Sequence, residues 1–131
     1  MTVWIVDAMN VIGSRPTGWW RDRPGAVRQL LEDSRRFAAA TGDEVILVVD
    51  GRPAADLPEG VPGAARLVYA RRAGADAADD RIVEMVASGE APPQARVITS
   101  DRRLQERLRA LGTTVESAGA WRRMFEATVG A

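Results

Sequence analysis

The chain has 131 residues, 18 basic and 18 acidic side chains for a formal net charge of zero, and neither Cys nor His. This composition excludes disulfides, zinc sites built on thiolate or imidazole, and Ser-His or Cys-His nucleophile pairs. Because every basic residue is Arg, a Schiff-base lysine and the lysine of a Walker loop are excluded as well. We expect a single domain over residues 1–131, located in the cytoplasm and without membrane contact, because no leader or long apolar run is present.

The first predicted element is a strand over residues 3–6, an apolar run of the kind that is buried on both faces of a sheet. Residues 11–23 contain two glycines and a proline and predict a loop. A helix is expected next, from start signals at Asp22 and Pro24 to a stop signal at Gly42, with its arginines on the outer face.

The rest of the chain alternates strands with helices. Residues 51–63, with three prolines and three glycines, predict an irregular connection. Strands are expected at residues 45–49, 66–70, 96–99 and 113–116, with the last at a sheet edge. Helices are expected at residues 74–89, at residues 118–128, and along a stripe formed by Leu104, Leu108 and Leu111. This alternation predicts an α/β sandwich with a mostly parallel sheet of four or five strands.

Three of the predicted strands are followed by an aspartate, at Asp7, Asp50 and Asp101. Because the carboxyl ends of parallel strands share one edge, where ligands bind, we expect these acids to gather there. Ordinary alternatives exist: Asp7 and Asp50 could form turns, and Asp101 could cap the following helix. Asn10 and Ser100 lie beside the acids and could either orient a ligand or water, or serve as turn and cap residues.

The helix over residues 74–89 contributes further acids. Asp76 and Asp79 share a stripe with Val83 and Val86, which predicts that both carboxylates lie on the side packed against the sheet. Asp80 lies about 100° round the helix from Asp79 and is expected at the rim of the predicted site. The alternative for the first pair is a variant of the capping box.

A buried carboxylate without a cationic partner is costly, and a divalent cation removes that cost. Oxygen ligands without His or Cys suit Mg²⁺ or Mn²⁺. The predicted metal ligands are Asp7, Asp76, Asp79, Asp80 and Asp101, with Asn10, Ser100 and Asp50 in supporting positions.

The predicted loop over residues 11–23 places two tryptophans among arginines. Aromatic rings beside Arg offer stacking surfaces for unpaired bases and contacts for phosphate. The alternative is that one or both indoles fold back onto the core. The predicted RNA contacts are Arg15, Trp19, Arg21 and Arg102.

Four segments in this order and spacing resemble the NYN domains, and more narrowly their bacterial YacP-like branch within the PIN-like nucleases. They are residues 6–13, 48–51, 75–82 and 97–102. The resemblance implies a three-layer PIN-like α/β/α sandwich in which the first and fourth strands are neighbours, so that Asp7 lies against Asp101. The customary aromatic and glycine of the opening motif are replaced here by Ala8 and Met9.

The same resemblance implies a metal-dependent endoribonuclease in which Asp7, Asp79 and Asp101 are the catalytic acids. Its substrate would be single-stranded RNA, and an RNA on the ribosome is one candidate. The alternative is a non-catalytic RNA-binding or protein-interaction module of the same fold. A haloacid-dehalogenase-like phosphatase and a phospho-receiver domain both require a lysine that this chain lacks.

Overall fold

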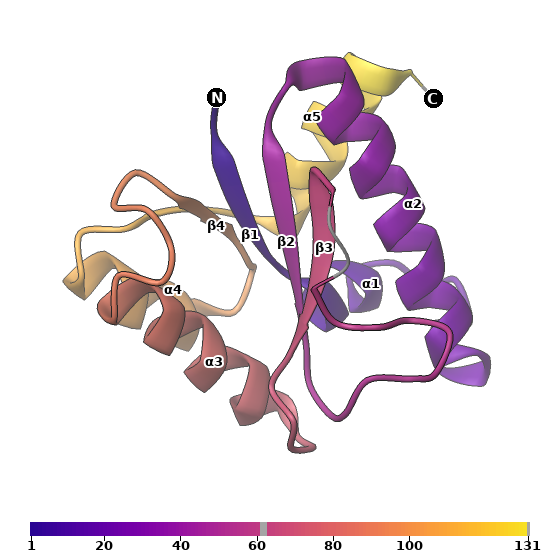
Figure 1. The fold of residues 1–131 in the computed structure, drawn as a ribbon, viewed down its shortest axis with the longest axis horizontal. Helices are drawn as coiled ribbons and strands as arrows, with labels where there is room; N and C mark the ends of the chain where they lie inside the picture. The colour runs from indigo at the N-terminus through magenta and orange to yellow at the C-terminus, as the bar shows by residue number, and fades with distance from the viewer. Residues whose placement is uncertain (61–62, 131) are drawn as a thin grey trace.

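The protein is described here by a computed structural model that covers residues 1–60 and 63–130. Within these residues the centre is a parallel sheet of five strands in the order β3-β2-β1-β4-β5 (Figure 1). The strands are β1 (Val3–Asp7), β2 (Glu44–Val49), β3 (Ala65–Tyr69), β4 (Arg96–Ile98) and β5 (Thr114–Glu116). The helices are α1 (Ala8–Gly13), the 3₁₀ helix η1 (Trp19–Arg21), α2 (Arg23–Thr41), α3 (Ala75–Ala87), α4 (Arg102–Ala110) and α5 (Ala118–Val129).

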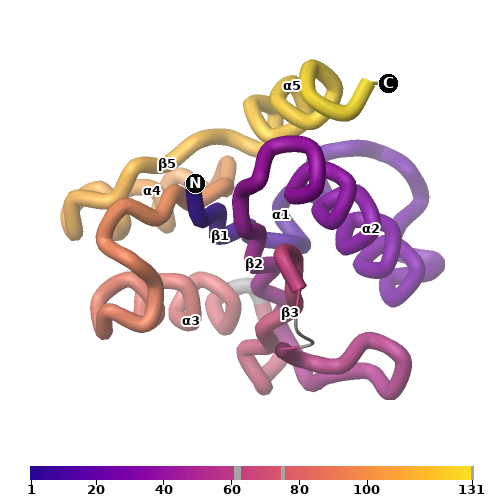
Figure 2. Tube along the Cα trace, turned by 45° about the horizontal axis from the view of Figure 1, so that its top comes forward, coloured from indigo at the N-terminus to yellow at the C-terminus, as the bar shows by residue number. Residues whose placement is uncertain are grey.

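Helices cover both faces of the sheet, as Figures 1 and 2 show. Side chains alternate along a strand, so Trp4 and Val6 of β1 enter the core shared with α1, α2 and α5. Val3 and Ile5 enter the second core, shared with α3 and α4. The same alternation directs Asp7 toward the α3 and α4 layer.

The strand order creates a topological switch point between β1 and β4. From β1 the chain adds β2 and β3 on one side and then returns to add β4 and β5 on the other. In open α/β sheets, ligands bind at the carboxyl ends of the two strands that flank such a point. The predicted sandwich, and the predicted adjacency of the first and fourth strands, are therefore confirmed.

The predicted helix between Asp22 and Gly42 is confirmed as α2. The Asp22 carboxylate accepts a hydrogen bond from the Gly25 N–H at 3.0 Å, and Gly42 ends the helix at a φ of 79°, a conformation that favours glycine. The predicted loop over residues 11–23 is wrong at its start, because α1 begins directly after β1. Burial of Ala8 and Val11 against the core stabilises that short helix.

Two further predictions need correction. Leu111 does not join the buried stripe of Leu104 and Leu108, because α4 ends at Ala110 and leaves Leu111 47% exposed. In α3 the fully buried residues are Ile82 and Met85, whereas the valines expected on the inner stripe are only half-buried. Ile82, Met85 and Asp79 are buried as expected. The buried face is nevertheless rotated by roughly 100° from the stripe of Asp76, Asp79, Val83 and Val86, so that Asp79 lies at its edge.

The connection after β2 is irregular as predicted, with an isolated bridge between Ala54 and Leu57. Its residues 61–62 lie outside the described part of the chain. None of the helices in the described residues combines the length and apolar character that a bilayer crossing requires.

Candidate active site

Asp7 is the last residue of β1 and is only 5% exposed. Its Oδ2 accepts a hydrogen bond from the Thr99 hydroxyl at 3.0 Å. Thr99 follows β4 and faces the same layer as Asp7, since β1 and β4 pair in parallel with Val6 opposite Ile98. The β1–β4 register therefore creates this contact between residues 92 positions apart in the sequence.

The pKa of Asp7 is raised from 3.8 to about 6. Burial is the main cause, because removal from water disfavours the charged form. The negative charges of Asp79 and Asp101 raise the pKa further, whereas the Thr99 hydrogen bond and the nearby Asn10 backbone N–H lower it. Asp7 occupies the N-cap position of α1, yet its side chain makes no cap hydrogen bond of standard geometry.

Asp79 lies in the second turn of α3, in the helical layer that Asp7 faces, and is 7% exposed. Its pKa is also raised, to about 6, first by burial and then by the charges of Asp101 and Asp76. The guanidinium of Arg107 on α4 opposes this effect. The charges of Asp79 and Asp101 raise the pKa of Asp7, and the charge of Asp101 raises that of Asp79, so we treat these three acids together as the candidate acidic centre.

Asp101 combines two roles. Its Oδ1 accepts a hydrogen bond from the Leu104 N–H at 3.0 Å, so it caps α4 as the ordinary alternative predicted. Its own N–H donates to the Thr99 hydroxyl at 3.1 Å, so Thr99 links the backbone of Asp101 to the carboxylate of Asp7. The second oxygen of Asp101 makes no hydrogen bond with the described residues and is available to a ligand.

Buried carboxylates without a cationic partner characterise this centre. In the part of the chain that the structure describes, Asp7 and Asp79 form no ion pair, although eight other contacts between Arg and acidic side chains occur there. No three acidic side chains among these residues already converge at coordination distance. The donor set is entirely oxygen and carries uncompensated charge, which fits a hard dication such as Mg²⁺ or Mn²⁺.

The remaining predicted acids are less buried than Asp7 and Asp79, although the charges of Asp76 and Asp80 also raise the pKa of Asp79. Asp50 pairs with Arg23 at the start of α2. Asp80 is exposed, as predicted, and both of its oxygens bind arginines. Asp76 is exposed, so the prediction that it faces the sheet is wrong, and the rotation of α3 explains why. The capping-box alternative is also wrong, because Gly74 occupies the N-cap position of α3.

Asn10 and Ser100 make the hydrogen bonds of turn and cap residues. The Asn10 side-chain oxygen accepts from the Ser100 N–H at 2.8 Å, and the Ser100 hydroxyl accepts from the Ala118 N–H at 2.9 Å. Together they join α1, the start of α4 and the start of α5. Their contribution to the site is to fix the segments that carry Asp7 and Asp101.

The predicted RNA contacts differ in exposure. Trp19 is half-buried and packs edge-on against Trp20, with ring centroids 6.0 Å apart. Trp20 is 60% exposed, and the Arg21 guanidinium lies 5.9 Å from its ring centroid. The alternative that the indoles fold back onto the core therefore holds in part for Trp19 and is wrong for Trp20. Arg15 and Arg102 are exposed.

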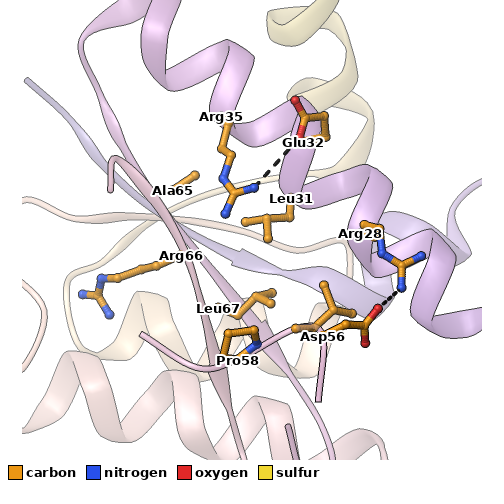
Figure 3. A pocket seen from close by; sticks show the side chains of 10 residues that line it. Arg28, Leu31, Glu32, Arg35, Asp56, Pro58, Ala65, Arg66 and Leu67 are labelled. Atoms are coloured by element: carbon orange, nitrogen blue, oxygen red, sulfur yellow. Dashed lines mark hydrogen bonds and ion pairs between the residues drawn. The ribbon is translucent and has the colours of Figure 1, made fainter. Parts of the chain in front are cut away.

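Two hollows on the α2 side of the sheet do not include the acidic centre. One, of about 290 Å³, lies between α2 and β3 (Figure 3), and the other, of about 460 Å³, lies among α1, α2 and α5. None of the three central acids lines either of them.

Thr99 and Arg107 are the site residues that sequence reasoning missed. Thr99 could have been found from the sequence: it lies two residues after Val97 and so faces the same side of the sheet, which is the side of Asp7 if β1 and β4 are neighbours. No sequence signal identifies Arg107, because its proximity to Asp79 depends on how α4 packs against α3.

Comparisons with known proteins agree with this architecture. The model of the YacP-like NYN domain family matches residues 4–129. A crystal structure of Rae1 (YacP) from Bacillus subtilis superposes with a TM-score of 0.74 at 24% identity, covering 98% of this chain and 75% of that one. Its W164L mutant superposes with a TM-score of 0.76 at the same identity, covering 98% and 77%. Among curated proteins, none matches the sequence.

Proposed function

The chain belongs to the YacP-like NYN domain family, whose fold is of the nuclease type, and on this premise we propose that it is a divalent-metal-dependent endoribonuclease. The observation that carries the proposal is that Asp7 and Asp79 are buried without an ion pair to any described residue, beside Asp101 at the switch point of the sheet. Perturbed carboxylates in such a position are typical of catalytic sites.

Asp7, Asp79 and Asp101 would hold one or two Mg²⁺ or Mn²⁺ ions. When bound, such an ion lowers the pKa of a coordinated water and stabilises negative charge on the phosphorus and the leaving oxygen. The chain itself orients the ligands: Thr99 fixes Oδ2 of Asp7, and the Leu104 N–H fixes Oδ1 of Asp101. The second oxygen of Asp101 and both oxygens of Asp79 make no hydrogen bond with the described residues and would be open to the ion.

Single-stranded RNA is the proposed substrate, and the segment around η1 would bind it. Arg23 at the start of α2 pairs with Asp50 just beyond β2, so η1, which immediately precedes α2, also lies at the carboxyl edge of the sheet. The exposed face of Trp20, with Arg21 beside it, offers a stacking surface to an unpaired base. Trp20 is thus a better candidate than Trp19 for stacking, with Arg15 and Arg102 as phosphate contacts.

The direct test is cleavage of a single-stranded RNA by the purified protein with Mn²⁺, with and without EDTA. Asp7→Asn and Asp101→Asn should each abolish cleavage, because each removes a charged ligand. Asp33→Asn, on the opposite side of the sheet in α2, is the matched control and should cleave normally. Equal cleavage by the wild type and both site variants would contradict the proposal.

A second candidate is an RNA-binding module that does not cleave. It is favoured by one observation, that no three acids among the described residues already converge on one point. Titration calorimetry separates the two functions. Mn²⁺ uptake by the wild type that is lost in Asp79→Asn supports the nuclease, whereas intact bound RNA without Mn²⁺ uptake supports the module.

A further inference from the structure

Asp80 joins two arginines from different segments at the rim of the acidic centre. Its Oδ2 lies 2.6 Å from a guanidinium nitrogen of Arg72, in the segment between β3 and α3. Its Oδ1 lies 3.0 Å from a guanidinium nitrogen of Arg107, on α4. One exposed carboxylate therefore fixes the two cations relative to each other, and we call these three residues the rim triad.

The rim triad carries a net charge of +1 and retains hydrogen-bonding capacity. Each guanidinium has five N–H donors, and the side chains of Arg72 and Arg107 bind no other acceptor among the described residues. The side chains of Arg72 and Arg107 are 59% and 37% exposed. Exposed ion pairs contribute little to stability, so folding alone gives no strong reason for this arrangement.

The rim triad lies next to the candidate active site. Asp80 follows Asp79 on α3, and the positive charge of Arg107 lowers the pKa of Asp79, against the effect of burial. Three acids repel a polyanionic substrate, whereas guanidinium groups beside them attract it and bind phosphate in a defined geometry. If RNA occupies the acidic centre, phosphates next to the reacting one would therefore pass near these arginines.

We propose that Arg72 and Arg107 bind backbone phosphates of the RNA, and that Asp80 is a positioning residue for both arginines and is not a metal ligand. This inference rests on the proposed function, since it assumes that RNA occupies the acidic centre. It assigns a substrate-binding role to two arginines that are not among the RNA contacts predicted from the sequence.

The test measures RNA binding separately from cleavage. Fluorescence anisotropy with a single-stranded RNA, in the cleavage-deficient Asp7→Asn background, gives the affinity over a series of salt concentrations. Arg72→Gln and Arg107→Gln should each weaken binding several-fold and reduce the slope of log affinity against log salt by about 0.7, the value for one phosphate contact on a single strand.

The matched control is Arg35→Gln, which removes an exposed arginine whose one ion pair among the described residues is with Glu32 on α2 (Figure 3). It should leave both affinity and slope unchanged. If Arg72→Gln and Arg107→Gln behave like this control, the inference is overturned even when the wild type cleaves RNA. If both weaken binding as expected but the wild type cleaves nothing, the phosphate contacts stand and the nuclease proposal fails.

Mn²⁺ calorimetry tests the role of Asp80. Asp80→Asn should bind Mn²⁺ as the wild type does, whereas Asp79→Asn should lose affinity. The arginines remain in Asp80→Asn but are less well positioned, so its RNA affinity should fall while its salt slope is kept. Loss of Mn²⁺ affinity in Asp80→Asn equal to that in Asp79→Asn would overturn the assignment of Asp80.

Discussion

Replacing Asp7 with asparagine should stabilise the metal-free protein at neutral pH. The carboxylate is buried, has no cationic partner among the described residues, and faces the charges of Asp79 and Asp101. Asparagine has nearly the same shape and keeps an oxygen that can accept the Thr99 hydroxyl bond. Most mutations of buried residues destabilise a protein, so a gain in stability here would be a specific outcome.

The size of the effect follows from the pKa of Asp7. One pKa unit corresponds to about 1.4 kcal/mol, so the rise from 3.8 to about 6 corresponds to about 3 kcal/mol of lost stability when the group is ionised. The amide nitrogen of asparagine will lack a partner, at a cost of about 1 kcal/mol. The net gain is about 2 kcal/mol, or roughly 7 °C in Tm for a chain of 131 residues.

The gain should depend on pH in a defined direction. The folded-state pKa of Asp7 lies above its unfolded value, so the stability due to the neutral group is fully present below pH 3.8 and is lost as pH rises through about 6. Asp7→Asn does not titrate. Below pH 3.8 only the amide cost of about 1 kcal/mol should remain, so the variant should be slightly less stable than the wild type there. Its relative stability should then rise between pH 3.8 and about 6 and be constant above.

Thermal unfolding in EDTA over this pH range measures the effect, with Asp33→Asn as a control that should stay within about 0.5 kcal/mol of the wild type. Mn²⁺ should reverse the order, since an ion at one hundred times its Kd stabilises the wild type by about 2.7 kcal/mol and the variant far less. Asp7→Asn that is less stable than the wild type in EDTA at pH 7, or equally affected at all pH values, would refute the reasoning.

Three further substitutions test other parts of the structure. Asp101→Asn should lose RNA cleavage and keep its Tm, because Asn caps a helix about as well as Asp; a large fall in Tm would mean that the cap hydrogen bond requires the charge. Trp20→Ala should weaken single-stranded RNA binding by about 1–3 kcal/mol in anisotropy at unchanged Tm, and unchanged affinity would remove the stacking role. Leu108→Ala, in a fully buried position, should cost about 2–5 kcal/mol in urea unfolding, and a cost below about 1 kcal/mol would contradict its place in the core.

The fold was predictable because its signals are strong and local. Continuous apolar runs identify strands buried on both faces, and Asp22 and Gly42 delimit α2 through a cap and a left-handed turn. The short helix α1 was missed because six residues give too little periodicity, and tertiary packing of Val11 stabilises it instead.

The candidate site was predictable only in part. Asp7 and Asp101 follow neighbouring parallel strands, so the backbone alone places both at the carboxyl edge of the sheet. Ile82 and Met85 of α3 were correctly expected inside, but the stripe of Asp76, Asp79, Val83 and Val86 is not the centre of the buried face. Asp79 is therefore buried at the edge of that face, whereas Asp76 is at the surface. The arginine partners of Asp80 could not be predicted, since they depend on side-chain positions between separate segments.

The distribution of arginine argues that the charge of the acidic centre is functional. The chain has 18 arginines and 18 acidic residues, enough for every buried acid to have an arginine partner. Guanidinium groups instead neutralise acids at the periphery, such as Asp50 and Asp80, while Asp7 and Asp79 have none among the described residues. An arginine at the centre would occupy the oxygens that a dication needs, whereas at the rim it can bind a phosphate. The presence or absence of an arginine partner thus separates the acids expected to bind metal, Asp7 and Asp79, from Asp80, which is expected to position the arginines that bind the substrate.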